Sequence, residues 1–299
     1  MRRTAVLSRA LIVLTAIGIA PVLVASCSSL TSPRISAHSS FQIIDFPGAV
    51  ETIASAINSS GVVVGRYDGT DGKTHGFRFS EGHFTTVDVP GADFTMVRGV
   101  NDAGAMVGAT RKTKGRNTAY LMQAGEVTLL AVPRAIESSA FDVNNQGHVV
   151  GSYESSDGVT RGFALHHGRY ITLEYPEAKL TYATGINDRG EIVGRWDSSD
   201  GRKQGFYWAK GRFIVLNIPG STVTLPDGIN EKHHVVGLYE VGDGRAYGFR
   251  RSARGIQRIS YPGSIRTVAR GLNNRGDIVG RFELADGKGH GYLLPAHGR

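Results

Sequence analysis

Histidines are the first candidates for chemistry in this chain, because four of the ten occur in two pairs. The pairs are His166-His167 and His233-His234, and each lies beside a short turn. A zinc site needs three or four imidazole, thiolate or carboxylate ligands, often at short spacings in the sequence. We find no Cys, Asp or Glu at such a spacing from either pair. The sequence therefore predicts no metal site and implies no cofactor.

Arginines recur at fixed positions and form a second set of candidates. Arg66, Arg195 and Arg281 each follow a Val-Gly pair at one phase of a repeat, and Arg98 and Arg270 share another phase. Guanidinium groups bind carboxylates and phosphates through paired hydrogen bonds. These five side chains could therefore bind an anion, although a solvated basic surface is an equally simple interpretation.

Hydrolytic chemistry has little support in local motifs. The stretch Ser199-Asp200-Gly201 is similar to the Asp-box of sialidase propellers, but its spacing differs and fits a hairpin turn better. No nucleophile elbow or phosphate loop is evident. An acid and a base could still converge from different parts of the chain. Glu137, Asp142 and Asp227 are the carboxylates that depart from the repeat and could serve in this way.

The elements that position these residues repeat every 43 residues. An asparagine begins a tight turn in each copy, at Asn58, Asn101, Asn144, Asn187, Asn230 and Asn273. Six copies without insertion or deletion indicate one rigid structural unit facing near-identical neighbours.

Each copy contains four strand-like runs. In the fourth copy these are 181–187, 191–196, 204–208 and 213–219, with turns of the Asn-Asp-x-Gly, Asp-Gly and Lys-Gly kinds between them. The chain has 40 glycines and no long segment with helical periodicity. We therefore predict an all-β fold, and four short strands every 43 residues are typical of a six-bladed β-propeller.

The two ends of the repeat region favour a closed ring over a β-solenoid. FQIIDF (41–46) matches the last strand of a copy with nothing before it, and the sixth copy stops after its third strand. We expect the N-terminal strand to complete the last blade, because that pairing removes an exposed sheet edge.

The first strand of each copy has a regular pattern around its asparagine. Six residues before it stands a hydroxyl residue, which we expect to bond an adjacent blade or a turn backbone. Two and four residues before it stand mainly Gly and Ala, which let neighbouring blades approach. Three residues before it the side chain varies: Ser55, Arg98, Phe141, Thr184, Asp227 and Arg270.

The N-terminal segment predicts export. Residues 1–26 combine a basic start with an uncharged run, Ala10 to Ala25, that is short for a membrane span. The run ends in Val-Ala-Ser-Cys, which resembles the lipobox of bacterial lipoproteins. Cys27 is the only cysteine, so a lipidated thiol is the favoured interpretation, and an ordinary signal cleaved near Ala25 is the alternative. Residues 27–40 would then be a lipidated tether and 41–299 the propeller.

The repeat also resembles a known family. The pattern G-I-N-D-x-G-x-I-V-G, followed by Asp-Gly and H-G-F, is similar to the HAF-type extracellular repeat of bacterial proteins, and His75-Gly76-Phe77 and His290-Gly291-Tyr292 come nearest to its core. The resemblance implies an exported repeat protein of the bacterial envelope. The family carries no agreed activity, so it assigns no catalytic residue.

Together these features predict a lipid-anchored, monomeric binding or scaffolding module that faces the periplasm or the cell surface. Basic residues number 34 against 26 acidic ones, and nucleic acid is a poor partner for an exported protein. We expect recognition of an anionic glycan or an envelope protein through the long-loop face. This is the face with the loops from the fourth strand of one copy to the first strand of the next and from the second strand to the third. The alternatives are a polysaccharide hydrolase or lyase and a purely structural spacer. The predicted contacts are Arg66, Arg98, Phe141, Tyr182, Arg195, Trp196, Asp227, Arg270 and Arg281.

Overall fold

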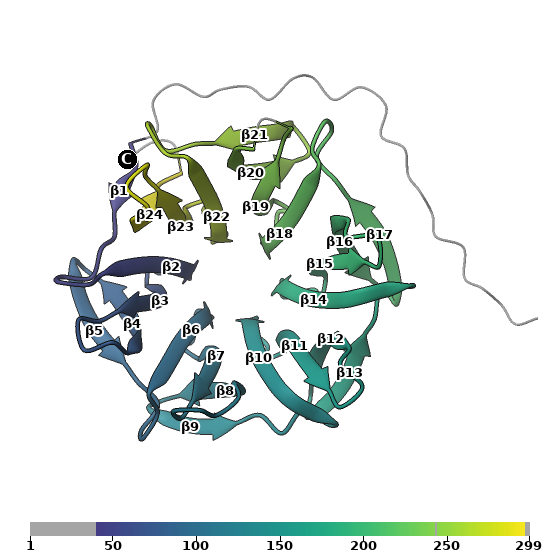
Figure 1. Ribbon diagram of the computed structural model, residues 1–299, viewed down its shortest axis with the longest axis horizontal. Helices are drawn as coiled ribbons and strands as arrows, with labels where there is room; N and C mark the ends of the chain where they lie inside the picture. The colour runs from purple at the N-terminus through teal and green to yellow at the C-terminus, as the bar shows by residue number, and fades with distance from the viewer. Residues whose placement is uncertain (1–39, 243, 297–299) are drawn as a thin grey trace, which may run out of the picture.

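The computed structural model describes residues 40–242 and 244–296, and all elements of regular secondary structure within them are β-strands (Figure 1). The predicted signal segment and Cys27, together with the tether up to residue 39, lie outside this part. No helix in the described residues is long and apolar enough to cross a membrane. The all-β fold predicted from the sequence is confirmed.

The described strands form six four-stranded antiparallel units; the first five follow the order of the sequence, and β1 is the fourth strand of the sixth. Units one to three are β2 (Glu51–Ile57), β3 (Val63–Asp68), β4 (Thr74–Ser80), β5 (His83–Val87); β6 (Phe94–Val100), β7 (Met106–Arg111), β8 (Thr118–Gln123), β9 (Glu126–Leu129); and β10 (Ala135–Val143), β11 (Val149–Ser155), β12 (Thr160–His166), β13 (Arg169–Leu173). Units four to six are β14 (Ala178–Ile186), β15 (Ile192–Ser198), β16 (Lys203–Ala209), β17 (Arg212–Leu216); β18 (Val223–Ile229), β19 (Val235–Glu240), β20 (Ala246–Ser252), β21 (Gly255–Ile259); and β22 (Arg266–Leu272), β23 (Ile278–Glu283), β24 (Gly289–Leu294) with β1 (Gln42–Ile43).

The units are arranged as in a propeller. Figure 1 shows them around a centre, with the first strand of each unit innermost and the last at the rim. Single parallel bridges join units in pairs, at Thr74 with Phe94, Thr160 with Leu180 and Ala246 with Arg266, and so produce three eight-stranded sheets. Because each link is one residue pair, the four-stranded unit is the packing element.

The N-terminal fragment pairs with the C-terminal strand. Ile43 of β1 lies opposite Tyr292 of β24, and the Ile44 amide donates to the Gly291 carbonyl at 2.9 Å. The His290 ring nitrogen Nδ1 and the Asp45 carboxylate oxygen Oδ2 form a further hydrogen bond of 2.7 Å. The same contact joins His75 and Asp88 in the first unit, at 2.7 Å. The histidine of the H-G-F motif therefore ties the third strand of its unit to the segment after the fourth.

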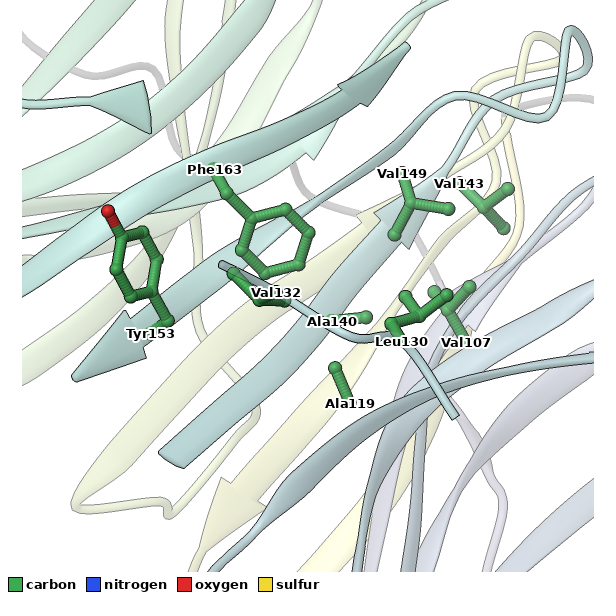
Figure 2. Packing of buried hydrophobic residues seen from close by; sticks show 9 residues of the cluster. All are labelled: Val107, Ala119, Leu130, Val132, Ala140, Val143, Val149, Tyr153 and Phe163. Carbon is green, nitrogen blue, oxygen red and sulfur yellow. The ribbon is translucent and has the colours of Figure 1, made fainter. Parts of the chain in front are cut away.

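The core lies between adjacent units and is built around one buried aromatic ring in each. The third strands carry Phe77, Tyr120, Phe163, Phe206, Phe249 and Tyr292, all at most 1% exposed. Each packs over a glycine in the second strand; a Cβ on Gly65 would lie 2.0 Å from the Ile53 carbonyl oxygen and 2.7 Å from the Phe77 ring. Figure 2 shows how Phe163 and Val149 of the third unit pack with Val107 of the second.

The hydroxyl residue of each first strand holds the entering loop. Thr52 accepts a hydrogen bond from the Phe46 amide at 3.0 Å, and Thr95, Thr181, Thr224 and Thr267 accept the equivalent bond in their units. Ser138 accepts instead from Ala119 of the second unit, at 3.0 Å. Both expected kinds of hydrogen bond are therefore confirmed: the threonines bond a turn backbone, and Ser138 bonds the adjacent unit.

The repeated asparagines form what we call the asparagine belt. Each side-chain oxygen accepts amide hydrogens of its own turn, and the side-chain nitrogen reaches the next unit. Asn101 Nδ2, for example, donates to the Asn144 carbonyl at 3.0 Å, and Asn273 Nδ2 donates to the Asn58 carbonyl at 3.1 Å. Asn187 is the exception, because its nitrogen donates to Glu191 at 2.6 Å within its own turn. The belt therefore links neighbouring units at five of the six asparagines.

This exception allows the belt to be tested. Asn101→Ala removes a turn acceptor and the bond to the next unit, whereas Asn187→Ala removes only bonds within its own turn. The Asn101 side chain makes two hydrogen bonds, from the Ala105 amide and to the Asn144 carbonyl. We expect Asn101→Ala to lower the free energy of unfolding by about 2 kcal/mol, at the usual net value of about 1 kcal/mol for each buried hydrogen bond. Asn187→Ala loses three bonds within its own turn and should cost at least as much. Denaturant unfolding measures both losses, and a loss of about 1 kcal/mol or less for Asn101→Ala would show that the bond between units adds no stability.

Candidate functional site: an arginine-lined central cavity

A β-bulge in the first strand of every unit directs one side chain toward the centre. The ladder between first and second strands skips one residue in each unit, for example between Val97 and Gly99 and between Ala269 and Gly271. The extra residues are the variable set noted above: Ser55, Arg98, Phe141, Thr184, Asp227 and Arg270. Bulges commonly re-aim side chains at functional sites.

The bulge residues line two connected hollows on the axis. One, which we call the asparagine mouth, has a volume of about 100 Å³ and is lined by the belt and the residues next to it. The other, the arginine chamber, has a volume of about 310 Å³ and extends to Arg266, the first residue of β22. All bulge residues except Ser55 line both hollows. The chamber lies on the side of the longer loops, where each first strand begins.

The arginine chamber is strongly basic. Its lining contains five arginines and one carboxylate, namely Arg98, Arg195, Arg266, Arg270, Arg281 and Asp227. Two of the arginines have carboxylate partners, since Arg281 bonds Glu51 at 3.0 Å and Arg266 lies 4.0 Å from Glu240.

Three chamber arginines have no carboxylate within 4.0 Å among the described residues: Arg98, Arg195 and Arg270. Burial and the nearby charge of Arg270 lower the pKa of Arg98 to about 9, so that it is still a cation at neutral pH. Burial also lowers the pKa of Arg270, and Asp227 opposes both shifts. Arg270 Nε is buried and has no hydrogen-bond partner in the part of the chain that the structure describes. An anion in the chamber would therefore relieve an electrostatic cost.

Two aromatic rings support the unpaired guanidinium groups. Arg98 lies over the Phe141 ring at 4.9 Å from its centroid, and Arg195 lies over Tyr182 at 4.4 Å. The ring centroids of Phe141 and Tyr182 are 6.4 Å apart. Cation–π contacts orient a guanidinium without neutralising its charge. The rings therefore hold the cations in place without using their N–H donors, of which Arg98 Nη1 donates to Met96 Sδ at 4.0 Å.

Asp142 lies on the first strand of the third unit, close to the first strand of the second unit. A Cβ on the neighbouring Gly99 would be only 2.7 Å from the Asp142 Cα. The Asp142 carboxylate accepts the Val143 amide at 2.9 Å and the Ile186 amide of the next unit at 3.0 Å. Desolvation nevertheless raises the pKa of Asp142 to about 7. Asp142 therefore titrates near neutral pH at the edge of the asparagine mouth.

The structure brings seven of the nine predicted contacts to the arginine chamber: Arg98, Phe141, Tyr182, Arg195, Asp227, Arg270 and Arg281. Trp196 is not among them. It follows Arg195 on the same strand and so points to the opposite side, where it is 9% exposed and stacks on Tyr175 at 4.3 Å. Arg66 bonds Glu51 at 3.2 Å and Asp68 at 2.7 Å and does not line the chamber.

Of the three carboxylates that could serve as an acid or a base, two line the hollows and one does not. Asp227 lines both hollows and Asp142 lines the mouth, whereas Glu137 accepts a hydrogen bond from Asn117 at 2.8 Å and lines neither. Arg266 also lines the chamber, and the sequence gives no sign of this, because its position at the start of β22 is evident only once the strand is placed. The bulges are not predicted from the sequence either, although a variable residue between two small ones is their signal.

Comparison with known proteins identifies the fold class. No protein-family model matches the chain, and neither does any curated protein. Among solved structures, AofleA from Arthrobotrys oligospora is 14% identical, with a TM-score of 0.57 over 89% of this chain and 91% of that one. A fungal lectin from Aleuria aurantia, described as a six-bladed β-propeller with a novel fucose recognition mode, is 9% identical, with a TM-score of 0.51 over 82% and 91%.

A third similar structure has a different context. The β-propeller domain of the Trilobed protease from Pyrococcus furiosus is 10% identical, with a TM-score of 0.50 over 83% of this chain and 81% of that one. At these identities the likeness shows the fold alone. The chain has a propeller-like fold, and its function has to be argued from its own site.

Asp142 makes stability depend on pH in a defined direction. Its pKa is about 7 in the folded protein and ordinarily 3.8, so between these values the folded state holds a proton that the unfolded state releases. We expect this residue's contribution to the free energy of unfolding to fall as the pH rises through that window. Asp142→Ala, which copies Ala56 of the first unit, should flatten the fall. Denaturant unfolding at several pH values measures both proteins, and parallel pH profiles would contradict the assignment.

Proposed function

We propose that this chain is a non-catalytic carbohydrate-binding module that recognises an acidic glycan in the arginine chamber. The observation that carries the proposal is the set of three guanidinium groups, Arg98, Arg195 and Arg270, that line the chamber without a carboxylate of the described residues within ion-pair distance. A carboxylate, sulfate or phosphate on a sugar would supply the missing partner.

The size of the chamber favours a sugar over a folded protein as the direct ligand. Its volume of about 310 Å³ is at the lower end of the range of about 300–1,000 Å³ for small-molecule sites. One charged sugar, or the charged end of a longer chain, suits such a space. The fungal lectin with the similar fold supports carbohydrate recognition in general, without indicating which sugar this chain binds.

The proposed architecture is a six-bladed propeller in which β1 completes the last blade. The six 43-residue copies, the pairing of β1 with β24 and the bond from Asn273 to Asn58 support this ring. The proposed setting is the bacterial envelope, with a monomeric propeller tethered through a lipidated Cys27. The lipobox-like end of the signal segment and the HAF-like repeats support that setting.

Charge-selective binding tests the function directly. Polygalacturonate and its methyl ester share a sugar backbone, but only the former carries free carboxylates. We expect saturable binding of polygalacturonate fragments that weakens with added salt, and little binding of the ester. Reducing ends counted in the same samples detect turnover. New reducing ends would favour the hydrolase or lyase alternative, and failure to bind any of a panel of uronate, sulfated and phosphorylated glycans would contradict the proposal.

Substitutions then locate the binding site. Arg98→Ser and Arg270→Ser copy the residue of the first unit, Ser55, and each should weaken binding by about tenfold or more, because a charge-assisted hydrogen bond is lost. The slope of affinity against salt should also decrease. Arg212→Ala removes an exposed arginine outside the chamber and serves as the control. Equal effects of all three substitutions would assign binding to the general surface charge instead.

A further inference from the structure

Three histidines of the third unit lie together at the end of the molecule that carries the asparagine belt. They are His148, in the turn between β10 and β11, and His166 and His167, at the turn between β12 and β13. Each offers a ring nitrogen, and these three atoms all lie within 4.8 Å of one another. The ring centroids are 3.8 Å apart for His148 and His166 and 4.8 Å apart for His148 and His167. The fold has added a third imidazole to a pair that looked isolated in the sequence.

The strand pairing explains why they meet. In a four-stranded meander, the turn after the first strand and the turn after the third lie at the same end. Val149 pairs with Leu165 in the ladder between β11 and β12, so His148 and His166 are the next residues beyond that pair. The belt fixes His148, because its amide donates to Asn144 Oδ1 at 2.9 Å and its carbonyl accepts from the Asn144 amide at 3.0 Å.

Only the third unit carries histidine at all three positions. His234 of the fifth unit is equivalent to His148, but Ser252 and Ala253 stand where His166 and His167 would be. The corresponding triplets in the remaining units are Val62, Ser80 and Glu81; Ala105, Gln123 and Ala124; Glu191, Ala209 and Lys210; and Asp277, Pro295 and Ala296. The propeller scaffold therefore does not require these histidines.

His148 itself is buried and incompletely satisfied. It is 3% exposed, and its Nε2 atom has no hydrogen-bond partner within residues 40–242 and 244–296. His166 and His167 are exposed. Burial and the two neighbouring imidazoles lower the pKa of His148, which keeps the ring neutral at physiological pH. A neutral imidazole with a free nitrogen is the form that binds metal ions.

We propose that His148, His166 and His167 form a binding site for a divalent transition-metal ion such as Zn²⁺, Ni²⁺ or Cu²⁺. Imidazole is a preferred ligand of these ions, and three imidazoles leave at least one coordination position for solvent or a further ligand. Zn–N bonds of about 2.0–2.1 Å place tetrahedral ligands about 3.4 Å apart. The two exposed histidines can rotate to close the cluster from its present spacing.

The surroundings of His148 indicate a moderate affinity. Metal-bound histidines usually donate their second ring N–H to a carboxylate or carbonyl. Here His148 Nδ1 faces the Asn144 side-chain nitrogen at 3.4 Å, and that nitrogen also donates to the Asn187 carbonyl at 3.0 Å. A metal on Nε2 would move the ring proton to Nδ1, beside another donor. We therefore expect weaker binding than in a structural zinc site.

Calorimetric titration of the full chain, without a polyhistidine tag, tests the site with Zn²⁺, Ni²⁺ and Cu²⁺ separately. We expect one ion per chain at about pH 7.5 and loss of binding at about pH 5.5, because protons compete for the imidazoles. The melting temperature should rise with the ion that binds. The absence of binding by all three ions at the higher pH would overturn the proposal.

Variants that copy other units keep the test independent of misfolding. His148→Ala copies Ala105, His166→Ser copies Ser80, and His167→Ala copies Ala124, which has the same positive φ as His167, 51° against 46°. Each should weaken binding by about tenfold or more. His233→Ala, outside the cluster, is the control. Unchanged affinity in the folded His148 and His166 variants would also overturn the proposal, whatever the result of the glycan experiments.

Discussion

The asparagine belt is the contact on which the rest of this structure depends. One side chain per unit closes its own turn with its oxygen and, in five units, holds the next unit with its nitrogen. Both functions are buried, so losing either would leave polar groups unsatisfied. Each of these bonds joins equivalent positions of neighbouring units, and the last joins Asn273 to Asn58, so the belt sets the same spacing at five of the six junctions between units.

A constant spacing has a consequence for the centre of the ring. The buried aromatics and the glycines beneath them occupy the space between units, which leaves little freedom for variation there. The bulged residue of each first strand is different, since it projects toward the axis and packs against no repeated partner. This is where the chain carries a serine, a threonine, a phenylalanine, an aspartate and two arginines. The scaffold is repetitive, and the site is built from the one inward position that does not repeat.

The arginines in and beside the chamber differ in whether they have a carboxylate partner. Arg66 and Arg281 have the carboxylate of Glu51 between them, at 3.2 and 3.0 Å, so their charge is largely balanced. Arg98 and Arg270 are enclosed, with Asp227 as the opposing charge nearby and no ion pair among the described residues. An enclosed cation without a partner lowers stability, and a protein that keeps one gains from an anionic ligand. At the end of the molecule that carries the belt, His148 Nε2 is also buried without a hydrogen-bond partner among the described residues.

The sequence by itself determined the 43-residue length of the repeat, the four strands of each unit and the asparagines of the turns. It also determined that FQIIDF pairs as the fourth strand of the last unit. These features depend on local turn chemistry and on the alternation of side chains along a strand. The sequence also indicated most of the chamber residues, since their positions in the repeat are shared. Only the tertiary structure decided which way each side chain points. Trp196 packs in the core because it alternates with Arg195, and Arg66 is neutralised by Glu51 on the preceding strand. His148 joins His166 and His167 because two turns that are distant in sequence fall at one end of a meander, a proximity that spacing along the chain does not reveal.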